Sequence, residues 1–389
     1  MSLKAKDKEY IANTYNRFPV EICSGKGVEV YDENGKKYID LTSGIGVTAF
    51  GMCDEEWVKA VTNQLNTLQH TSNLFYTSPS VELAELLCTR TGLKKVFFCN
   101  SGAESNECAI KVARKYSQDK YGLGRHVIVT LVNSFHGRTI TTLSATGQDH
   151  FHKLFQPLTD GFIHITANSI EELKQLEDRQ DICAILMECV QGEGGVIPLD
   201  KKFVLEVEKL CKKKDLLLMI DEVQTGNGRT GELYAFEHYG ILPDVVSTAK
   251  GLGNGLPFGA TMLGEKVQNV LGYGDHATTF GANPVCSAGA LSVIKRMDRA
   301  FLDGVKNKSK MVFDTLTNAK GVISVSGMGL MIGIKTERNA RDIVNECIEK
   351  GVLCLMAKDK VRLLPALNIS NEKLTQALEI LKEVIGKGL

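Results

Sequence analysis

Short apolar segments alternate with helical patterns through the middle of the chain. Between the segments, apolar residues recur at three- and four-residue spacing, as they do over 203–211, which is typical of an amphipathic helix. The run 216–220 is apolar throughout, as expected for a strand covered on both faces. The pattern therefore predicts an α/β fold with a mainly parallel central sheet sandwiched by helices. The predicted strands are 96–99, 127–131, 182–187, 216–220, 245–248 and 260–263.

The two ends of the chain follow a different pattern. Residues 28–41 predict a β-hairpin, because Asn34 and Gly35 supply the positive φ angles of a tight turn. Beyond residue 300, a strand near 331–334 and a helix over 339–350 precede further strands and a final helix. This mixed order predicts a smaller α+β domain built from the N- and C-terminal segments. We expect an N-terminal segment at 1–45, a large domain at 46–285 and a C-terminal small domain at 286–389.

Composition narrows the possible partners. The chain has 389 residues, of which 43% are apolar, and its 46 basic and 46 acidic residues give zero net charge. Such a balance gives no cationic field for nucleic acid or anionic lipid. No apolar run is long enough to span a membrane or to serve as a signal segment. Eleven cysteines, an odd number with no C-x-x-C spacing, indicate reduced thiols. We expect a cytoplasmic protein with small-molecule substrates, no nucleic acid and no membrane.

Polar residues follow three of the predicted strands, where open parallel sheets bind ligands. Ser101 and Gly102 lead from a strand into a helix, whose first N–H groups can cradle an anion. Simple helix capping by Ser101 explains that stretch equally well. Asp221 ends the fully apolar run, and a buried carboxylate needs a cation or strong donors. Lys250 follows the strand at 245–248.

Asp221 and Lys250 have two interpretations. They could form an ion pair with each other. Alternatively, a lysine that binds an aldehyde, a cradle for a phosphate and a carboxylate for a ring nitrogen are the three things that pyridoxal 5'-phosphate (PLP) requires.

Other cofactor motifs are absent from the sequence. Gly251 and Gly253 lack the third glycine of a dinucleotide-binding loop, and neither a phosphate loop nor a serine-nucleophile motif occurs. His150 and His152 have too few neighbouring ligand residues for a metal site. We expect no metal.

Five segments resemble, in the same order along the chain, motifs of the class III aminotransferases. Five ordered motifs are far more specific than any one of them, and the match runs nearly end to end. The resemblance implies a fold type I PLP-dependent transferase, with PLP as cofactor and a homodimer whose subunits share active sites. The segments are 100–107 (NSGAESNE), 134–139 (SFHGRT), 191–195 (QGEGG), 221–226 (DEVQTG) and 249–251 (AKG).

The resemblance also implies which residues contact the cofactor. Lys250 would hold it and later carry the proton between substrate and cofactor, while Asp221 would pair with the pyridinium nitrogen. Gln224 would meet the ring hydroxyl, and Phe135 would stack on the ring face. The residues that would receive the phosphate are Ser101, Gly102, Ala103 and, from the neighbouring subunit, Thr279.

A second set would bind substrates, again by resemblance. Arg362 would clamp the α-carboxylate of glutamate or 2-oxoglutarate, because its planar fork makes two parallel hydrogen bonds. Arg138 would hold the distal carboxylate, and Tyr15 would line the distal end of the pocket. Glu193 would neutralise Arg362 when an ω-amine donor leaves that guanidinium without an anion. Glu188 would support the cofactor.

The chain departs from the family pattern in three places. Residues 51–55 (GMCDE) replace the usual Gly-His-x-His-Pro, Cys189 replaces a proline, and Ala282 replaces a customary glycine. None of these changes removes a catalytic group.

Within the class, residues 13–20 (NTYNRFPV), 329–333 (GLMIG) and 362–365 (RLLP) most resemble the acetylornithine-using members. This implies transfer of the terminal amino group of N-acetylornithine to 2-oxoglutarate, giving N-acetylglutamate semialdehyde and glutamate, in arginine biosynthesis. Ornithine, succinylornithine, succinyldiaminopimelate and 4-aminobutyrate remain alternative donors. A mutase or decarboxylase reaction on the same cofactor and a non-catalytic binding protein also remain open, although two carboxylate-binding arginines favour a dicarboxylate acceptor.

Overall fold

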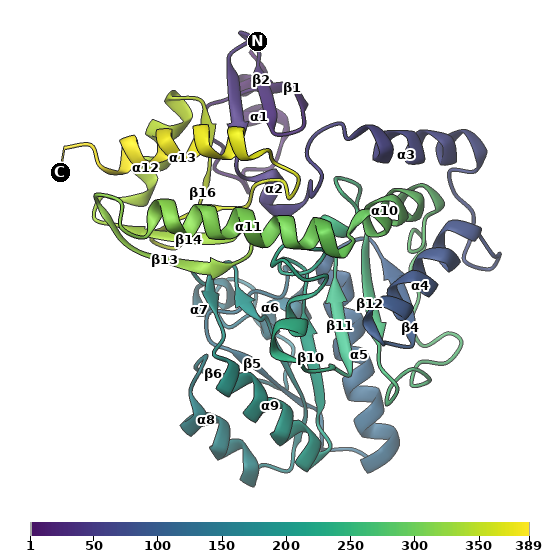
Figure 1. Cartoon of the computed structure of the whole chain (residues 1–389). Helices are drawn as coiled ribbons and strands as arrows, with labels where there is room; N and C mark the ends of the chain where they lie inside the picture. Colours follow the sequence, from purple (N-terminus) through teal and green to yellow (C-terminus); the bar gives the residue numbers. More distant parts are fainter. Residues whose placement is uncertain (1, 389) are drawn as a thin grey trace.

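A large sheet forms the centre of the computed structural model, which describes residues 2–388 (Figure 1). Its strand order is β4-β12-β11-β10-β7-β5-β6, and all neighbours are parallel except the two pairs that involve β12. The predicted mainly parallel sheet is therefore confirmed. Its strands are β4 (Lys95–Cys99), β5 (Val127–Leu131), β6 (Phe162–Ile165), β7 (Ile182–Met187), β10 (Leu217–Asp221), β11 (Val245–Thr248) and β12 (Gly259–Leu263).

Helices cover both faces of this sheet, and β10 shows how the sequence specifies that arrangement. All five of its residues are buried. Leu217 and Met219 pack in one apolar cluster with the buried face of α5 (Gly102–Tyr121). Leu218 and Ile220 point the other way, into the cluster that contains the buried face of α9 (Lys201–Lys214). A strand with two buried faces loses its polar alternation, as the apolar run predicted.

Some of this architecture was not visible in the sequence. Strand β6 was missed, because Phe162–Ile165 is a short edge strand that contains a histidine and is only partly buried. Two long helices, α10 (Pro284–Arg296) and α11 (Arg299–Leu316), were not anticipated either. The position of β12, antiparallel between two strands, also depends on tertiary pairing rather than on its own residues.

Two four-stranded sheets make up the smaller α+β part. In the first, β15 pairs parallel with β3, so the two ends of the chain join in one sheet. The boundaries that we expect at residues 45 and 285 remain predictions, and α10 spans the second of them. The first sheet consists of β1 (Ile22–Lys26), β2 (Glu29–Asp32), β3 (Lys37–Asp40) and β15 (Val352–Leu353). The second consists of β13 (Val322–Met328), β14 (Met331–Thr336), β17 (Lys360–Leu363) and β16 (Leu355–Ala357).

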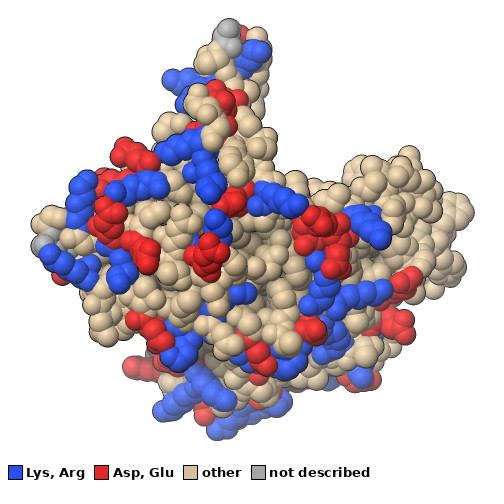
Figure 2. Space-filling model, turned by 45° about the horizontal axis from the view of Figure 1, so that its top comes forward, with Lys and Arg blue, Asp and Glu red and all other residues tan. Residues whose placement is uncertain are grey.

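Shorter elements connect and cover these sheets (Figure 1). Helix α1 (Leu3–Tyr10) has no buried residue and projects from the molecule beside β1 and β2. Charged side chains of both signs are interspersed over the surface shown in Figure 2, and no helix in residues 2–388 has the length and apolarity to cross a membrane. Further helices are α2 (Ser43–Gly46), α3 (Glu55–Thr67), α4 (Ser78–Thr91), α6 (Ile140–Ala145), α7 (Asp149–His152), α8 (Ile170–Gln175), α12 (Ala340–Glu349) and α13 (Asn371–Ile385), and a short hairpin joins β8 (Val190–Gln191) to β9 (Ile197–Pro198).

The three departures from the family pattern have local structural consequences. Ala282 adopts φ 60°, the left-handed conformation that favours the glycine usually found there. In the segment 51–55, Asp54 caps α3 by accepting from the Trp57 N–H at 2.9 Å, and it pairs with Arg296 at 2.7 Å. The chain therefore begins this helix without the customary histidines. Cys189 is fully buried.

Candidate active site

Two adjoining cavities open where β4, β10 and β11 end, and both are lined by Phe135, Arg138 and Lys250. We call the smaller one, of about 420 Å³, the inner cavity and the larger one, of about 830 Å³, the outer cavity. The inner cavity is lined mainly by residues that follow strands, including Ser101, Gly102, Ala103, Asp221, Val223, Gln224 and Lys250. The structure thus brings most of the predicted cofactor residues to one place.

Asp221 is buried in the wall of the inner cavity and is held by three donors. The Asn106 amide nitrogen lies 2.7 Å and His136 Nδ1 lies 2.8 Å from its Oδ2, and the Val223 backbone N–H donates to Oδ1 at 3.0 Å. Within residues 2–388, no ion pair joins it to Lys250, which was one of the two interpretations of this pair. Three donors from separate segments hold this buried carboxylate in a fixed position on the cavity wall.

Sequence reasoning assigned no role to Asn106 or His136, although both lie within the recognised motifs. Asn106 shares the buried face of α5 with Ala109 and Ala113, which lie three and seven residues further along the helix. A polar residue at that position on an apolar face needs a buried partner. That signal could have identified Asn106, whereas His136 comes from a separate loop and is found only in three dimensions.

Lys250 lies at the first position of the short turn that follows β11, with φ 45°. Desolvation lowers the pKa of its ammonium group, and the carboxylates of Glu193 and Asp221 offset part of that shift. Loss of a proton is thereby easier than for a lysine in water. A neutral amine is the form that attacks a carbonyl group.

The start of α5 lines the inner cavity, as Lys250 does. Ser101 caps the helix by accepting from the Glu104 N–H at 3.2 Å, so the capping interpretation is correct. The N–H groups of Gly102 and Ala103 have no acceptor within a helix at these positions, and both residues line the cavity. A Cβ on Gly102 would lie 2.6 Å from a Val223 methyl group, so only glycine fits there. Capping therefore leaves the first N–H groups of the helix available to an anion, and the phosphate-binding role expected for Ser101, Gly102 and Ala103 stays a prediction.

These features fit PLP on structural grounds. Two buried polar atoms beside Asp221, His136 Nε2 and Asn106 Oδ1, have no hydrogen-bond partner among residues 2–388. An amine, a fixed carboxylate, an aromatic face from Phe135 and free N–H groups at a helix start surround a cavity of suitable size.

Arg362 and Glu193 form a largely buried ion pair beside the cavities. Arg362 Nη1 lies 2.6 Å from Glu193 Oε1, and Gln224 joins them through two hydrogen bonds of 3.3 Å. Burial alone would raise the pKa of Glu193, but the Arg362 guanidinium outweighs it and holds that pKa below its usual range. Arg362 Nε has no partner among the described residues. The guanidinium therefore keeps spare donor capacity.

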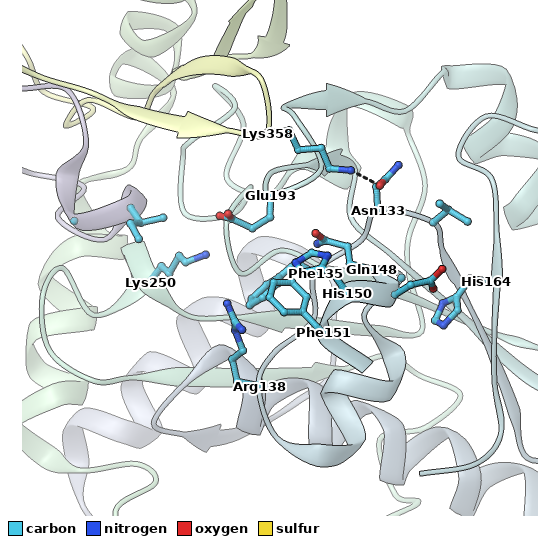
Figure 3. A pocket seen from close by; sticks show the side chains of 15 residues that line it. Asn133, Phe135, Arg138, Gln148, His150, Phe151, His164, Glu193, Lys250 and Lys358 are labelled. Carbon is cyan, nitrogen blue, oxygen red and sulfur yellow. Dashed lines mark hydrogen bonds between the residues drawn. The ribbon is translucent and has the colours of Figure 1, made fainter. Parts of the chain in front are cut away.

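The outer cavity extends from Lys250 past a pair of aromatic rings (Figure 3). The Arg138 guanidinium lies 4.2 Å from the centre of the Phe151 ring and 5.4 Å from that of Phe135. Within residues 2–388 no carboxylate pairs with it. An exposed, unpaired arginine on the wall of a cavity is available to bind an anionic substrate group.

Glu188 lines the inner cavity and is almost fully buried. It accepts from the Phe135 N–H at 3.1 Å and from the Gly192 N–H at 3.2 Å. Burial raises the pKa of its carboxyl to about 7. Glu188 therefore fixes the loop that carries Phe135, in line with the supporting position expected from the sequence.

Three predicted residues do not line either cavity within this single chain. One is Arg362, which is buried and pairs with Glu193, a residue of the outer cavity's lining. Tyr15 is exposed, and the Arg17 guanidinium lies 5.4 Å from its ring centre. Thr279 is also exposed, while its neighbour Thr278 accepts from the Asn100 side chain at 3.2 Å. The roles expected for Tyr15 and Thr279 stay predictions.

Backbone strain is concentrated at the outer cavity. Four of its non-glycine lining residues, Ile45, Asn133, Lys250 and Lys358, have positive φ angles. Such conformations are uncommon and accumulate at functional sites.

No cluster of three or more His, Cys, Asp or Glu residues able to hold a metal ion occurs between residues 2 and 388.

Comparison with known proteins agrees with this geometry. The family model described as aminotransferase class-III matches residues 10–385. An acetylornithine aminotransferase from Haemophilus ducreyi is 50% identical over 387 residues, which are 99% of this chain and 98% of the relative.

Two solved structures share the whole fold. An N-acetylornithine aminotransferase from Stenotrophomonas maltophilia is 33% identical, with a TM-score of 0.85 and coverage of 98% of both chains. An ornithine aminotransferase from Toxoplasma gondii, whose active site holds PLP at partial occupancy, is 28% identical, with a TM-score of 0.94 and coverage of 98% of this chain and 93% of that one.

Proposed function

The chain belongs to the class III aminotransferases, which are PLP-dependent enzymes, and we propose that it transfers the terminal amino group of N-acetylornithine to 2-oxoglutarate. The products are N-acetylglutamate semialdehyde and glutamate, and the reaction is a step of arginine biosynthesis in the cytoplasm. The observation that carries the choice of donor is 50% identity over nearly the full length to an acetylornithine aminotransferase. The buried Arg362–Glu193 pair supports it independently, because a reversible partner suits an enzyme that alternates between two kinds of substrate.

The residues of the inner cavity divide the work on the cofactor. When bound, PLP supplies a carbonyl carbon that carries the amino group and a ring that stabilises negative charge. Lys250 holds that carbon through Nζ and, once released, moves a proton between substrate and cofactor. Asp221 keeps the ring nitrogen protonated, Phe135 and Gln224 orient the ring, and the start of α5 binds the phosphate.

Residues of the outer cavity, together with Arg362, which pairs with Glu193 of its lining, select the substrate. Arg362 binds the α-carboxylate of glutamate or 2-oxoglutarate after Glu193 has moved away, and Arg138 binds the distal carboxylate. When an ω-amine donor enters, its methylene groups lie against Arg362, and Glu193 returns to neutralise the guanidinium. Removing the partner of a buried charge costs about 3 to 5 kcal/mol, so this return stabilises the donor complex.

We propose that the working form is a homodimer. Apolar side chains at residues 74–76 are strongly exposed, as is Phe280. The two segments lie side by side, since the Asn73 side chain donates to the Gly281 carbonyl at 2.8 Å. The lobe of Figure 2 that corresponds to α3 and α4 in Figure 1 also carries few charges. An apolar surface next to Thr279 fits a contact with a partner subunit. Thr279 would there reach the phosphate of the cofactor that the partner subunit binds.

A panel of amines tests the donor. Single half-reactions with N-acetylornithine, ornithine, succinylornithine, succinyldiaminopimelate and 4-aminobutyrate are followed through the absorbance of the bound cofactor. We expect N-acetylornithine to have the largest kcat/KM. An equal or larger value for any other amine would overturn the proposed donor.

Ornithine is the second candidate, since the Toxoplasma gondii ornithine aminotransferase has a TM-score of 0.94 to this chain. The same panel compares the two donors directly.

A further inference from the structure

The outer cavity contains one cation to which the proposed reaction gives no task. Lys358 lies in the turn between β16 and β17, outside the large sheet, and its side chain reaches across the cavity wall. Its ammonium group donates to Asn133 Oδ1, in the loop that follows β5 (Figure 3). This contact joins the small part of the molecule to the large sheet at the far side of the cavity from Lys250.

No carboxylate neutralises Lys358 within residues 2–388, because its partner Asn133 is an uncharged amide. The other charges that line the cavity do not compensate for it. Glu193 is paired with Arg362, and Asp149, which is exposed as Lys358 and Arg138 are, offsets only one of these two positive charges. Burial lowers the pKa of His164 to about 4, so that ring is neutral at pH 7. The distal wall therefore carries an excess of positive charge from Lys358 and Arg138.

Both partners of this contact have positive φ angles. Lys358 has φ 53° and Asn133 has φ 68°. The Asn133 N–H donates to the Gly147 carbonyl at 2.7 Å, which fixes the loop. Asparagine adopts this conformation readily, and Lys358 adopts it in the two-residue turn that joins β16 to β17. Both side chains are therefore presented to the cavity from defined turns.

We propose that Lys358 and Asn133 form a subsite for the acyl group of an Nα-acylated diamino acid, with Lys358 as the residue that discriminates against donors with a free α-amine. The inference rests on the proposed function and deepens it. In Figure 3, Arg138 and Lys358 lie on opposite sides of the Phe135 and Phe151 rings. A donor whose carboxylate binds Arg138 presents its Nα-substituent to Lys358.

Charge explains the direction of the selection. The α-ammonium of ornithine would face Lys358 as a like charge, and like charges a few ångströms apart repel each other even where water screens them. Acylation removes that charge and supplies a carbonyl oxygen that can accept from the Lys358 ammonium. A hydrogen bond to a charged group is stronger than one between neutral groups. The same residue therefore attracts the acylated donor and repels the free one.

The test compares the cofactor-loaded wild type with Lys358→Met and with the control Lys335→Met. Lys335 is an exposed lysine nearby that pairs with Asp359 and does not line the cavity. We expect Lys358→Met to lower the ratio of kcat/KM for N-acetylornithine over ornithine by about tenfold or more, with the glutamate half-reaction and Lys335→Met within about twofold of wild type. An unchanged ratio, or equal losses with both donors and glutamate, would overturn the subsite.

A binding measurement separates recognition from chemistry. N-acetylnorvaline and norvaline lack the terminal amine, and the pyridoxamine form of the cofactor does not react with the α-amine that norvaline keeps, so calorimetry with that form reports binding alone. We expect wild type to bind N-acetylnorvaline more tightly and Lys358→Met to lose that preference. If the preference survives in the variant, the subsite is wrong. If wild type binds N-acetylnorvaline as expected but does not turn over N-acetylornithine, the proposed function fails while the subsite stands.

Discussion

At the scale of single residues, Asp221 shows how a fixed carboxylate is assembled from separate parts of the chain. Its donors come from α5, from the loop after β5 and from its own loop. A carboxylate at the end of a fully apolar strand can be identified from the sequence, and so can a lysine that follows the next strand. The position of Asn106 on the apolar face of α5 indicates that it needs a buried partner, but the sequence does not identify that partner, and His136 gives no such signal. The two lie 115 and 85 residues from Asp221 and meet it only through packing.

Glu193→Ala tests the residue that pairs with Arg362. We expect the rate of the half-reaction with N-acetylornithine to fall on the order of a hundredfold. The variant removes the carboxylate that pairs with the buried Arg362 guanidinium, and this donor brings no anion to replace it. The glutamate half-reaction should change by a few-fold at most, since its α-carboxylate takes that place. Stopped-flow measurement of both half-reactions checks this.

Glu193→Gln is the matched control for side-chain size, and it should resemble the alanine variant if charge is what matters. Equal losses in the two half-reactions would contradict the role given to Glu193.

At the scale of elements, the start of α5 combines helix capping with an open cradle. Ser101 satisfies the Glu104 N–H, and Gly102 and Ala103, whose N–H groups have no acceptor within the helix, line the inner cavity. The sequence predicted a helix here and offered capping and anion binding as alternatives, whereas the observed capping leaves room for both. Local pattern was enough for strands such as β10, whose apolar run is uninterrupted, and not for β6, where a partly exposed edge gives no clear period.

Gly102→Ala tests the cradle. The new Cβ would lie 2.6 Å from a Val223 methyl group, so the helix start or Val223 must shift. Overpacking of this kind costs about 1 to 3 kcal/mol, and we expect roughly a tenfold or larger increase in the dissociation constant of PLP. Spectroscopic titration of the apoprotein measures it.

The double variant Gly102→Ala with Val223→Ala removes the conflicting methyl groups and should recover most of the affinity. Weak binding in the double variant, or full binding in the single one, would contradict the steric account.

At the scale of the whole molecule, buried carboxyls make stability depend on pH. Glu222 is fully buried beside Asp221 but does not line either cavity, and burial raises the pKa of its carboxyl to about 7 from an ordinary value of 4.5. The folded state therefore binds more protons than the unfolded state between these two values. Stability from this group falls as pH rises from about 4.5 to 7 and stays low above that range.

Glu222→Gln removes this dependence, because an amide does not ionise. Two and a half pKa units correspond to a penalty on the order of 3 kcal/mol, or roughly 4 °C in Tm for a chain of this length. We expect the Tm of the variant minus that of wild type to rise by about this amount between pH 4.5 and pH 8, at a fixed PLP concentration. Any cost of fitting the amide is the same at every pH. A difference that is flat or falls with pH would contradict the pKa assignment.

The central claim is that Lys250 holds the cofactor opposite Asp221, and reduction with borohydride tests it most directly. Reduction of the PLP-loaded protein makes the link between lysine and cofactor permanent, and mass spectrometry of the digest locates it. We predict one modified peptide, the one that contains Lys250, and none in Lys250→Ala treated in the same way. A sample that stays colourless with PLP, or a label on another lysine while Lys250 is unmodified, would contradict the account.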